Sequence, residues 1–147
     1  MLKSSERAKH VIEEEGENGV HVQIAAEAGF ERLKSFQVSK YIRGCAGFSG
    51  FARNSFNREY VENLSKEMNE IVGSRWSEWG TEQVTSNIVV ANSPKSFVLK
   101  HPKYCNCNYM DLKNAHFFHF MGFCRFGKGV YAGLAKGIVN NCGKNES

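Results

Sequence analysis

The stretch Tyr60-Val-Glu-Asn-Leu-Ser-Lys-Glu-Met-Asn-Glu-Ile-Val-Gly73 carries the clearest structural pattern in the chain. Its apolar residues recur with a period near 3.6 residues, which is typical of a helix with one buried face. Asn54 or Ser55 is a suitable N-cap before this stretch, and Gly73 is a suitable stop after it. The pattern predicts an amphipathic helix packed on an apolar core.

Weaker patterns flank this helix on both sides. Further helices are expected over 80–91, ended by Asn92-Ser-Pro94, and over 129–140. Strand-like patterns occur at 20–24, 41–53, 97–99 and 115–121. Because strands alternate with helices, we expect an α/β fold class, with α+β as the alternative.

Length and composition are those of an ordinary globular domain. The chain has 147 residues, of which 41% are hydrophobic and 23% charged, and a chain of this size can bury its own core. Residues 1–18 are charged and poor in large apolar side chains, so we expect disorder or a frayed helix there. The sequence predicts one domain over 19–140 and a tail over 141–147.

The charges and cysteines exclude several functions. The net charge of +4 is too mild for nucleic-acid binding, although it is compatible with peripheral contact with an anionic membrane. No apolar run is long enough for a membrane span, the start is no signal peptide, and the five cysteines are odd in number, so we expect a reduced, cytoplasmic protein. Asp111 is the single aspartate, which excludes an Asp-x-Asp metal motif from this sequence.

One candidate site is the run His119-Phe-Met-Gly122-Phe-Cys-Arg125. A histidine at a strand end, a glycine three residues on and a cation three further can converge on one phosphate, because glycine permits close approach and guanidinium pairs with phosphate. The imidazole can also ligate a divalent metal ion. The alternative is a buried aromatic strand followed by a turn glycine and a surface arginine.

A second candidate is Glu82-Gln83-Val-Thr-Ser-Asn87, at the start of an expected helix. A carboxylate and carboxamides there can bind sugar hydroxyls and stabilise positive charge at an anomeric carbon. The alternative is that Glu82 only favours the start of the helix. Trp76 and Trp79 precede the motif, and an exposed indole can stack on a sugar, whereas a buried one covers the core.

A zinc site competes with these interpretations. Thiolates and imidazoles suit zinc, but a C-x-C pair separated from H-x-x-H by eight residues matches no common finger spacing. The alternative for these cysteines is buried free thiols. The candidate ligands are Cys105, Cys107, His116, His119 and Cys124.

Four segments, in this order, resemble motifs in the C-terminal half of GT-A glycosyltransferases. The likeness covers residues 40–140 and is closest to the family-8 retaining enzymes, the glycogenin and bacterial lipopolysaccharide galactosyltransferase group. That family shows an Asn-Ser-Gly-type strand, Asp-Gln-Asp-x-x-Asn, a strand leading to Tyr-Asn, and His-x-x-Gly-x-x-Lys-Pro-Trp. The corresponding segments are Cys45-Ala-Gly47-Phe, Glu82 to Asn87, Leu99 through Tyr104-Cys-Asn106, and His119 to Arg125-Phe.

The resemblance implies a partial GT-A-like mixed sheet with two to three flanking helices. It also implies a nucleotide sugar (UDP-hexose) as donor and a glycan as acceptor. Gln83 would then lie near the anomeric centre and Glu82 would bind donor or acceptor hydroxyls. Further substrate contacts would come from Asn87, Trp79 and Gly47.

The same resemblance assigns the last segment to the nucleotide diphosphate. His119 would ligate Mn²⁺ or Mg²⁺ on it, and Gly122 and Arg125 would contact its phosphates. The sequence departs from the family, however, because Arg125-Phe126 replaces Lys-Pro, and Glu82 and Val84 replace aspartates. One imidazole also cannot hold a hard ion that prefers several oxygen ligands.

A transferase of this fold also needs a nucleotide-binding half before the sugar site, and residues 1–39 are too few to build it. We therefore expect a truncated or split transferase that is weakly active or inactive alone. A complementing chain or an oligomer would then supply the nucleotide-binding half. A non-enzymatic domain that binds a glycan or a protein is the first alternative, and a small zinc-stabilised module is the second.

Overall fold

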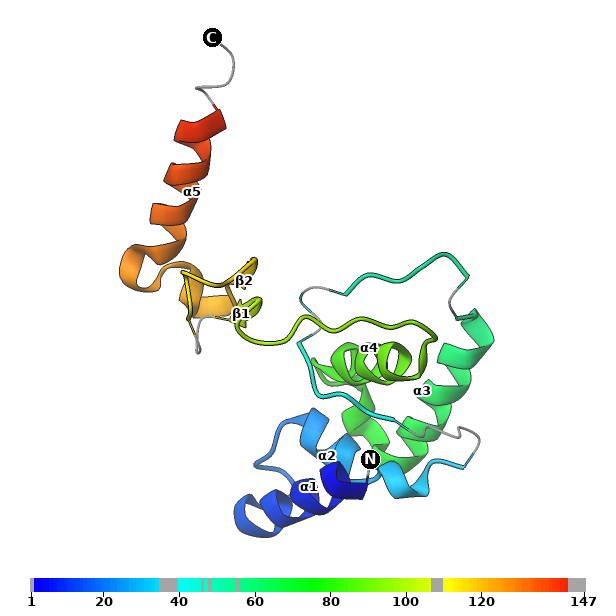
Figure 1. Cartoon of the computed structure of the whole chain (residues 1–147). Helices are drawn as coiled ribbons and strands as arrows, with labels where there is room; N and C mark the ends of the chain where they lie inside the picture. The colour runs from blue at the N-terminus through cyan, green and yellow to red at the C-terminus, as the bar shows by residue number, and fades with distance from the viewer. Residues whose placement is uncertain are drawn as a thin grey trace. The chain divides into compact units, whose positions relative to one another are not determined.

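The computed structural model describes residues 2–34, 40–45, 47, 49–54, 56–106 and 110–142. They fall into two compact parts, unit 1 (Met1–Ser96) and unit 2 (Phe97–Ser147), both drawn in Figure 1. The boundary lies inside the segment 19–140 for which the sequence predicts one domain. The candidate residues are thus divided, with Glu82 to Asn87 in unit 1 and His119 to Arg125 in unit 2.

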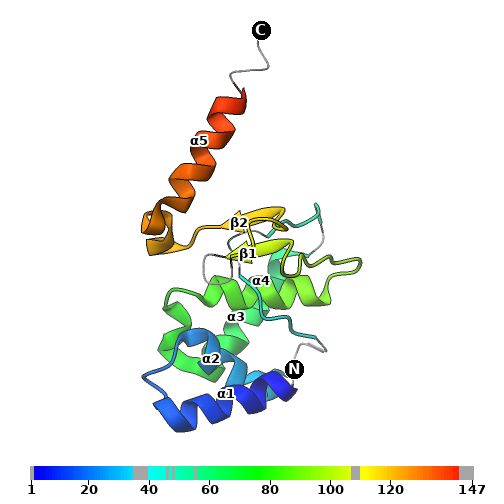
Figure 2. The same ribbon diagram turned by 60° about the vertical axis from the view of Figure 1, so that its left-hand side comes forward.

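Unit 1 is helical. Its α-helices are α1 (Leu2–Glu15), α2 (Val22–Ala28), α3 (Arg58–Val72) and α4 (Thr81–Asn92). Short 3-10 turns follow α2 and α3, namely η1 (Phe30–Arg32) and η3 (Gly73–Ser77). In the view of Figure 2, α1 and α2 lie below α3 and α4. Residues 1–18, expected to be disordered or a frayed helix, thus include the 14-residue helix α1, whose Ser5 hydroxyl donates to the carbonyl of Ala28 at 2.9 Å.

The amphipathic helix predicted from the sequence is confirmed as α3. Leu64 and Met68 on its inner face are fully buried, and Gly73 ends the helix at φ +64°. The N-cap is Asn57 rather than Asn54 or Ser55, and its Oδ1 accepts from the backbone N–H of Tyr60 at 2.7 Å. The core that α3 covers consists of Ala26, Phe30, Leu64, Met68, Trp76, Val84 and Ile88.

Two of the strands expected in unit 1 are not strands. Residues 20–24 enter α2, because the His21 side chain accepts from the backbone N–H of Gln23 and caps the helix at 3.2 Å. The described residues of 41–53 form no strand. The Nδ2 of Asn87 donates to the carbonyl of Gly44 at 3.1 Å. The helix expected over 80–91 is confirmed as α4.

Unit 2 supplies the sheet. Strands β1 (Tyr104–Asn106) and β2 (Phe117–His119) pair in parallel. They are followed by η4 (Gly122–Arg125), η5 (Gly127–Gly129) and α5 (Val130–Cys142). The strand expected over 115–121 and the helix expected over 129–140 are confirmed, whereas 97–99 is irregular.

The fold class is α/β, as the sequence predicts, with helices predominating and one small parallel sheet in the described part of the chain. Within that part, no helix combines the length and the apolarity needed to cross a bilayer.

Candidate functional site: a polar cluster beside the start of α4

Buried polar side chains gather where α2, the segment 40–45 and α4 meet. Gln23 and Glu27 come from α2 and Asn87 from α4, and their exposed fractions are 6%, 4% and 8%. Polar groups removed from water need hydrogen-bond partners. We call these three residues, with Tyr41, Arg43 and Gln83, the polar cluster.

A directional chain of hydrogen bonds runs through the polar cluster. Gln83 Nε2 donates to Gln23 Oε1 at 2.8 Å, and Gln23 Nε2 donates to the Tyr41 hydroxyl at 3.0 Å. The Tyr41 hydroxyl in turn donates to Glu27 Oε1 at 2.9 Å. Because the amide nitrogen of Gln83 donates to Gln23, this chain of hydrogen bonds fixes the orientation of the Gln83 carboxamide. The bonds of the chain join residues that lie 14 to 60 positions apart in sequence.

Glu27 is the charged end of this chain. Its Oε1 lies 3.0 Å from Arg43 Nε. Burial nevertheless raises the pKa of Glu27 above its ordinary value, against the lowering effects of the Arg43 charge and the Tyr41 hydrogen bond. Burial also raises the pKa of Tyr41, so the phenol stays protonated and acts as a donor.

Asn87 contacts the residue that directly precedes the first segment of the resemblance, Cys45-Ala-Gly47-Phe. Its side chain bonds to the Gly44 carbonyl, and a Cβ atom on Gly44 would lie 3.3 Å from Asn87 Oδ1. The contact therefore involves Gly44, three residues before Gly47. Gly47 itself is exposed, and its two neighbours lie outside the described residues.

Glu82 has the structural role expected as the alternative to sugar binding, which is to stabilise the start of α4. Its Oε2 accepts from the backbone N–H of Gly80 at 2.9 Å, just before the first turn of α4. Gly80 adopts φ +109°, and a Cβ atom there would lie 2.4 Å from the Cε1 atom of His21. A side chain at position 80 would thus displace His21.

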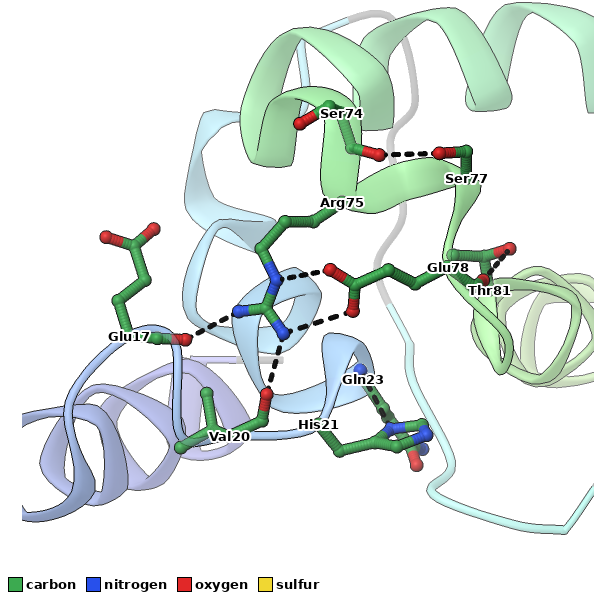
Figure 3. A network of polar contacts seen from close by, with 9 residues as sticks. All are labelled: Glu17, Val20, His21, Gln23, Ser74, Arg75, Ser77, Glu78 and Thr81. Carbon is green, nitrogen blue, oxygen red and sulfur yellow. Dashed lines mark hydrogen bonds and ion pairs between the residues drawn. The ribbon is translucent and has the colours of Figure 1, made fainter.

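Arg75 holds the loop before α4 against the loop between α1 and α2, as Figure 3 shows. Its guanidinium donates to the carbonyls of Glu17 and Val20, each at 2.6 Å, and pairs with the carboxylate of Glu78 at 2.9 and 3.2 Å. The hydrogen bond from Arg75 lowers the pKa of Glu78. Sequence reasoning misses Arg75, because two of its acceptors are backbone oxygens more than 50 residues away.

The two tryptophans differ in burial. Trp76 belongs to the core and donates its indole N–H to Ser65 Oγ at 2.9 Å. Trp79 is 84% exposed, and its ring meets that of His21 edge-on at a centroid distance of 5.8 Å. Trp76 is therefore a core residue, and Trp79 is an exposed indole whose contact with a sugar stays a prediction.

Replacing Gly80 by alanine should destabilise unit 1 by about 1–3 kcal/mol, since a non-glycine residue at this φ is strained and its Cβ meets His21. Gly16→Ala is the matched control, because Gly16 has φ +78° with nothing within 4 Å of its Cβ position. Urea unfolding measures both. Equal losses in the two variants would mean that the contact with His21 carries no cost.

The remaining predicted residues lie in unit 2. The Nδ1 atom of His119 and the Tyr104 hydroxyl are 2.8 Å apart in a hydrogen bond. Gly122 begins η4 with φ +39°, and Arg125 Nε donates to the carbonyl of Phe120 at 3.3 Å. Tyr104 is thus a partner of the predicted metal ligand.

The described residues include no group of three or more His, Cys, Asp or Glu side chains placed to hold a metal ion. The Cys105 thiol is buried and donates to the carbonyl of Pro102 at 3.0 Å. Cys107 and the side chain of Cys124 lie outside the described residues. Among the described residues, His119 is therefore the single predicted ligand for manganese or magnesium, fewer than such an ion takes.

Comparison with known proteins gives no match, whether family models, curated sequences or solved structures are searched. The resemblance to GT-A glycosyltransferases thus depends on this chain's own residues.

Proposed function

We propose that the chain is the sugar-recognition part of a GT-A-type glycosyltransferase, related to enzymes that move a hexose from a nucleotide sugar to a glycan acceptor. In that reaction the bond between the anomeric carbon and the diphosphate breaks, and an acceptor oxygen bonds to that carbon. The acceptor proton is released and the nucleoside diphosphate leaves. The proposal places the sugar at the polar cluster and the protein in the cytoplasm.

The hydrogen bond from Asn87 to the Gly44 carbonyl is the observation that supports this proposal most. The two residues are 43 positions apart; Asn87 belongs to one motif of the resemblance, and Gly44 directly precedes the motif before it, Cys45-Ala-Gly47-Phe. A shared sugar site requires these regions to be neighbours, and chance similarity of two short motifs does not. The contact is what a common site predicts for unit 1.

The proposed roles follow from hydrogen-bonding capacity. Gln83 donates its Nε2 to Gln23, and its carboxamide is proposed to lie near the anomeric carbon, because an amide dipole can stabilise positive charge that develops there. Glu82 is exposed, and the oxygen that does not cap Gly80 can accept from a sugar hydroxyl. His119, Gly122 and Arg125 are proposed to contact the diphosphate, and a divalent ion there would need oxygen ligands beyond this set.

Thermal melting with UDP-glucose and UDP-galactose, with and without manganese, tests the proposal. A ligand at ten times its Kd adds about 1.4 kcal/mol to the native state, which raises the Tm of a small domain by several degrees. We expect the UDP-hexose to stabilise the protein more than UDP does, while sugar transfer by the isolated chain stays slow.

Gln83→Met should abolish the extra stabilisation by the hexose, because the variant keeps the side-chain length and loses the amide. Ser86→Ala, on the same helix, is the control that should retain it. A Tm that is indifferent to every UDP-hexose would overturn the proposal, and rapid transfer by the isolated chain would contradict the expected weak activity.

A further inference from the structure

Trp79 is the most exposed large apolar residue that the structure describes in unit 1. Its exposed fraction of 84% compares with 42% or less for Ile42, Phe51 and Phe56. A single exposed aromatic side chain is unremarkable when it lies on a loose loop. The question is therefore how firmly the loop before α4 is held.

The backbone around Trp79 is fixed on both sides. Before it, Glu78 is paired with Arg75, which also donates to two carbonyls of the loop between α1 and α2. After it, the Thr81 hydroxyl donates to the Glu78 carbonyl at 3.3 Å (Figure 3). Glu82 also accepts from the backbone N–H of Gly80. The indole is thus presented to solvent in a preorganised position, which lowers the entropic cost of binding a ligand.

His21 adds a hydrogen-bond donor beside the indole. Because its Nδ1 accepts from the backbone N–H of Gln23, the neutral ring carries its proton on Nε2. The ring is exposed and its edge-on contact with Trp79 keeps the two side chains adjacent. The result is an apolar indole face with a hydrogen-bond donor beside it.

The surroundings of Trp79 favour a sugar over a protein partner. Contact residues of a protein hot spot are enclosed by further packed side chains that exclude water. The chain neighbours of Trp79 are instead Glu78, Gly80, Thr81 and Glu82. A hexopyranose ring has one apolar C–H face that an indole can cover and hydroxyls at its edge that imidazole and carboxylate groups can bind.

We infer that Trp79 and His21 form a subsite for a hexose residue of the glycan acceptor, with Trp79 stacking on the sugar ring and His21 Nε2 donating to a hydroxyl. This inference rests on the proposed function in taking the start of α4 as the glycan-facing side. The subsite adjoins the polar cluster, because His21 Nδ1 accepts from the backbone N–H of Gln23.

NMR titration of the full chain with gluco-, galacto- and manno-configured oligosaccharides tests the subsite. At least one of these sugars should shift the indole N–H signal of Trp79 in the wild type. Trp79→Ala should weaken binding about tenfold and Trp79→Phe should restore most of it, because phenylalanine keeps an aromatic face. His21→Asn keeps an N-cap acceptor and should weaken binding about threefold.

Phe51→Ala, at another exposed aromatic residue of unit 1, is the control and should bind like the wild type. The inference is overturned if no oligosaccharide perturbs Trp79, if Trp79→Ala binds normally, or if Trp79→Ala instead abolishes self-association. Oligosaccharide binding without any response to UDP-hexose would leave the subsite in place and refute the transferase proposal. The converse result would refute the subsite alone.

Discussion

Replacing Leu64 by alanine should lower the free energy of unfolding of unit 1 by about 2–5 kcal/mol, the usual range for a fully buried leucine. Leu64 lies on α3 and packs in the same core cluster as Val84 and Ile88 of α4. These two α4 residues directly follow Gln83 and Asn87 in sequence. The cavity left by the substitution would therefore loosen the helix that positions the polar cluster, as well as destabilise the unit.

Urea unfolding followed by helix circular dichroism measures this loss. Ile42→Ala is the control, because it removes the same number of carbon atoms from a side chain that is 39% exposed. We expect it to cost less than half as much as Leu64→Ala. Similar losses for the two variants would show that the core does not centre on α3.

The helix α3 could be predicted from the sequence because its signals agree. Apolar residues at helical spacing and a glycine after the last turn both indicate one helix. In the structure this glycine, Gly73, has a positive φ. The alternation at 20–24 is ambiguous, since Val22, Ala25 and Ala26 also share one helical face and are all buried. The cap formed by His21 decides in favour of helix, and a single histidine carries little weight in a sequence pattern.

Part of the candidate site could also be predicted. Glu82, Gln83 and Asn87 form a local motif, and the exposed Trp79 precedes it. Their partners could not be predicted, because Glu27 and Tyr41 come from separate segments and look unexceptional in isolation. Long-range pairing between single residues leaves no periodic trace in a sequence.

Arg43→Ala should destabilise unit 1 by about 1–3 kcal/mol at pH 7, because it leaves the Glu27 carboxylate buried without its nearest cation. The Arg43 side chain is itself 46% exposed, so the loss stays below that for a fully buried pair. The control Arg58→Ala breaks a pair with Glu62 that lies in solvent and should cost no more than about 0.5 kcal/mol.

The pH dependence of the free energy of unfolding tests whether the buried Glu27 carboxylate causes this loss. Because burial raises its folded pKa above the ordinary 4.5, the stability that Glu27 contributes is fully present below pH 4.5 and is lost as the pH rises through the folded pKa. Removing Arg43 raises the folded pKa further, so the loss continues to higher pH in the variant. The difference between wild type and Arg43→Ala should therefore be small near pH 4 and grow toward neutrality.

Glu27→Gln in the Arg43→Ala background should recover much of the stability at pH 7. Glutamine can still accept from the Tyr41 hydroxyl, it needs no cation, and it does not titrate. Unfolding free energies of the four proteins in this cycle, measured from pH 4 to 8, give the coupling between the two residues. If the double variant were as unstable at pH 7 as Arg43→Ala alone, Arg43 would stabilise the unit by packing rather than by compensating the buried carboxylate. In that case the charge on Glu27 would not contribute, through Tyr41 and Gln23, to the orientation of Gln83.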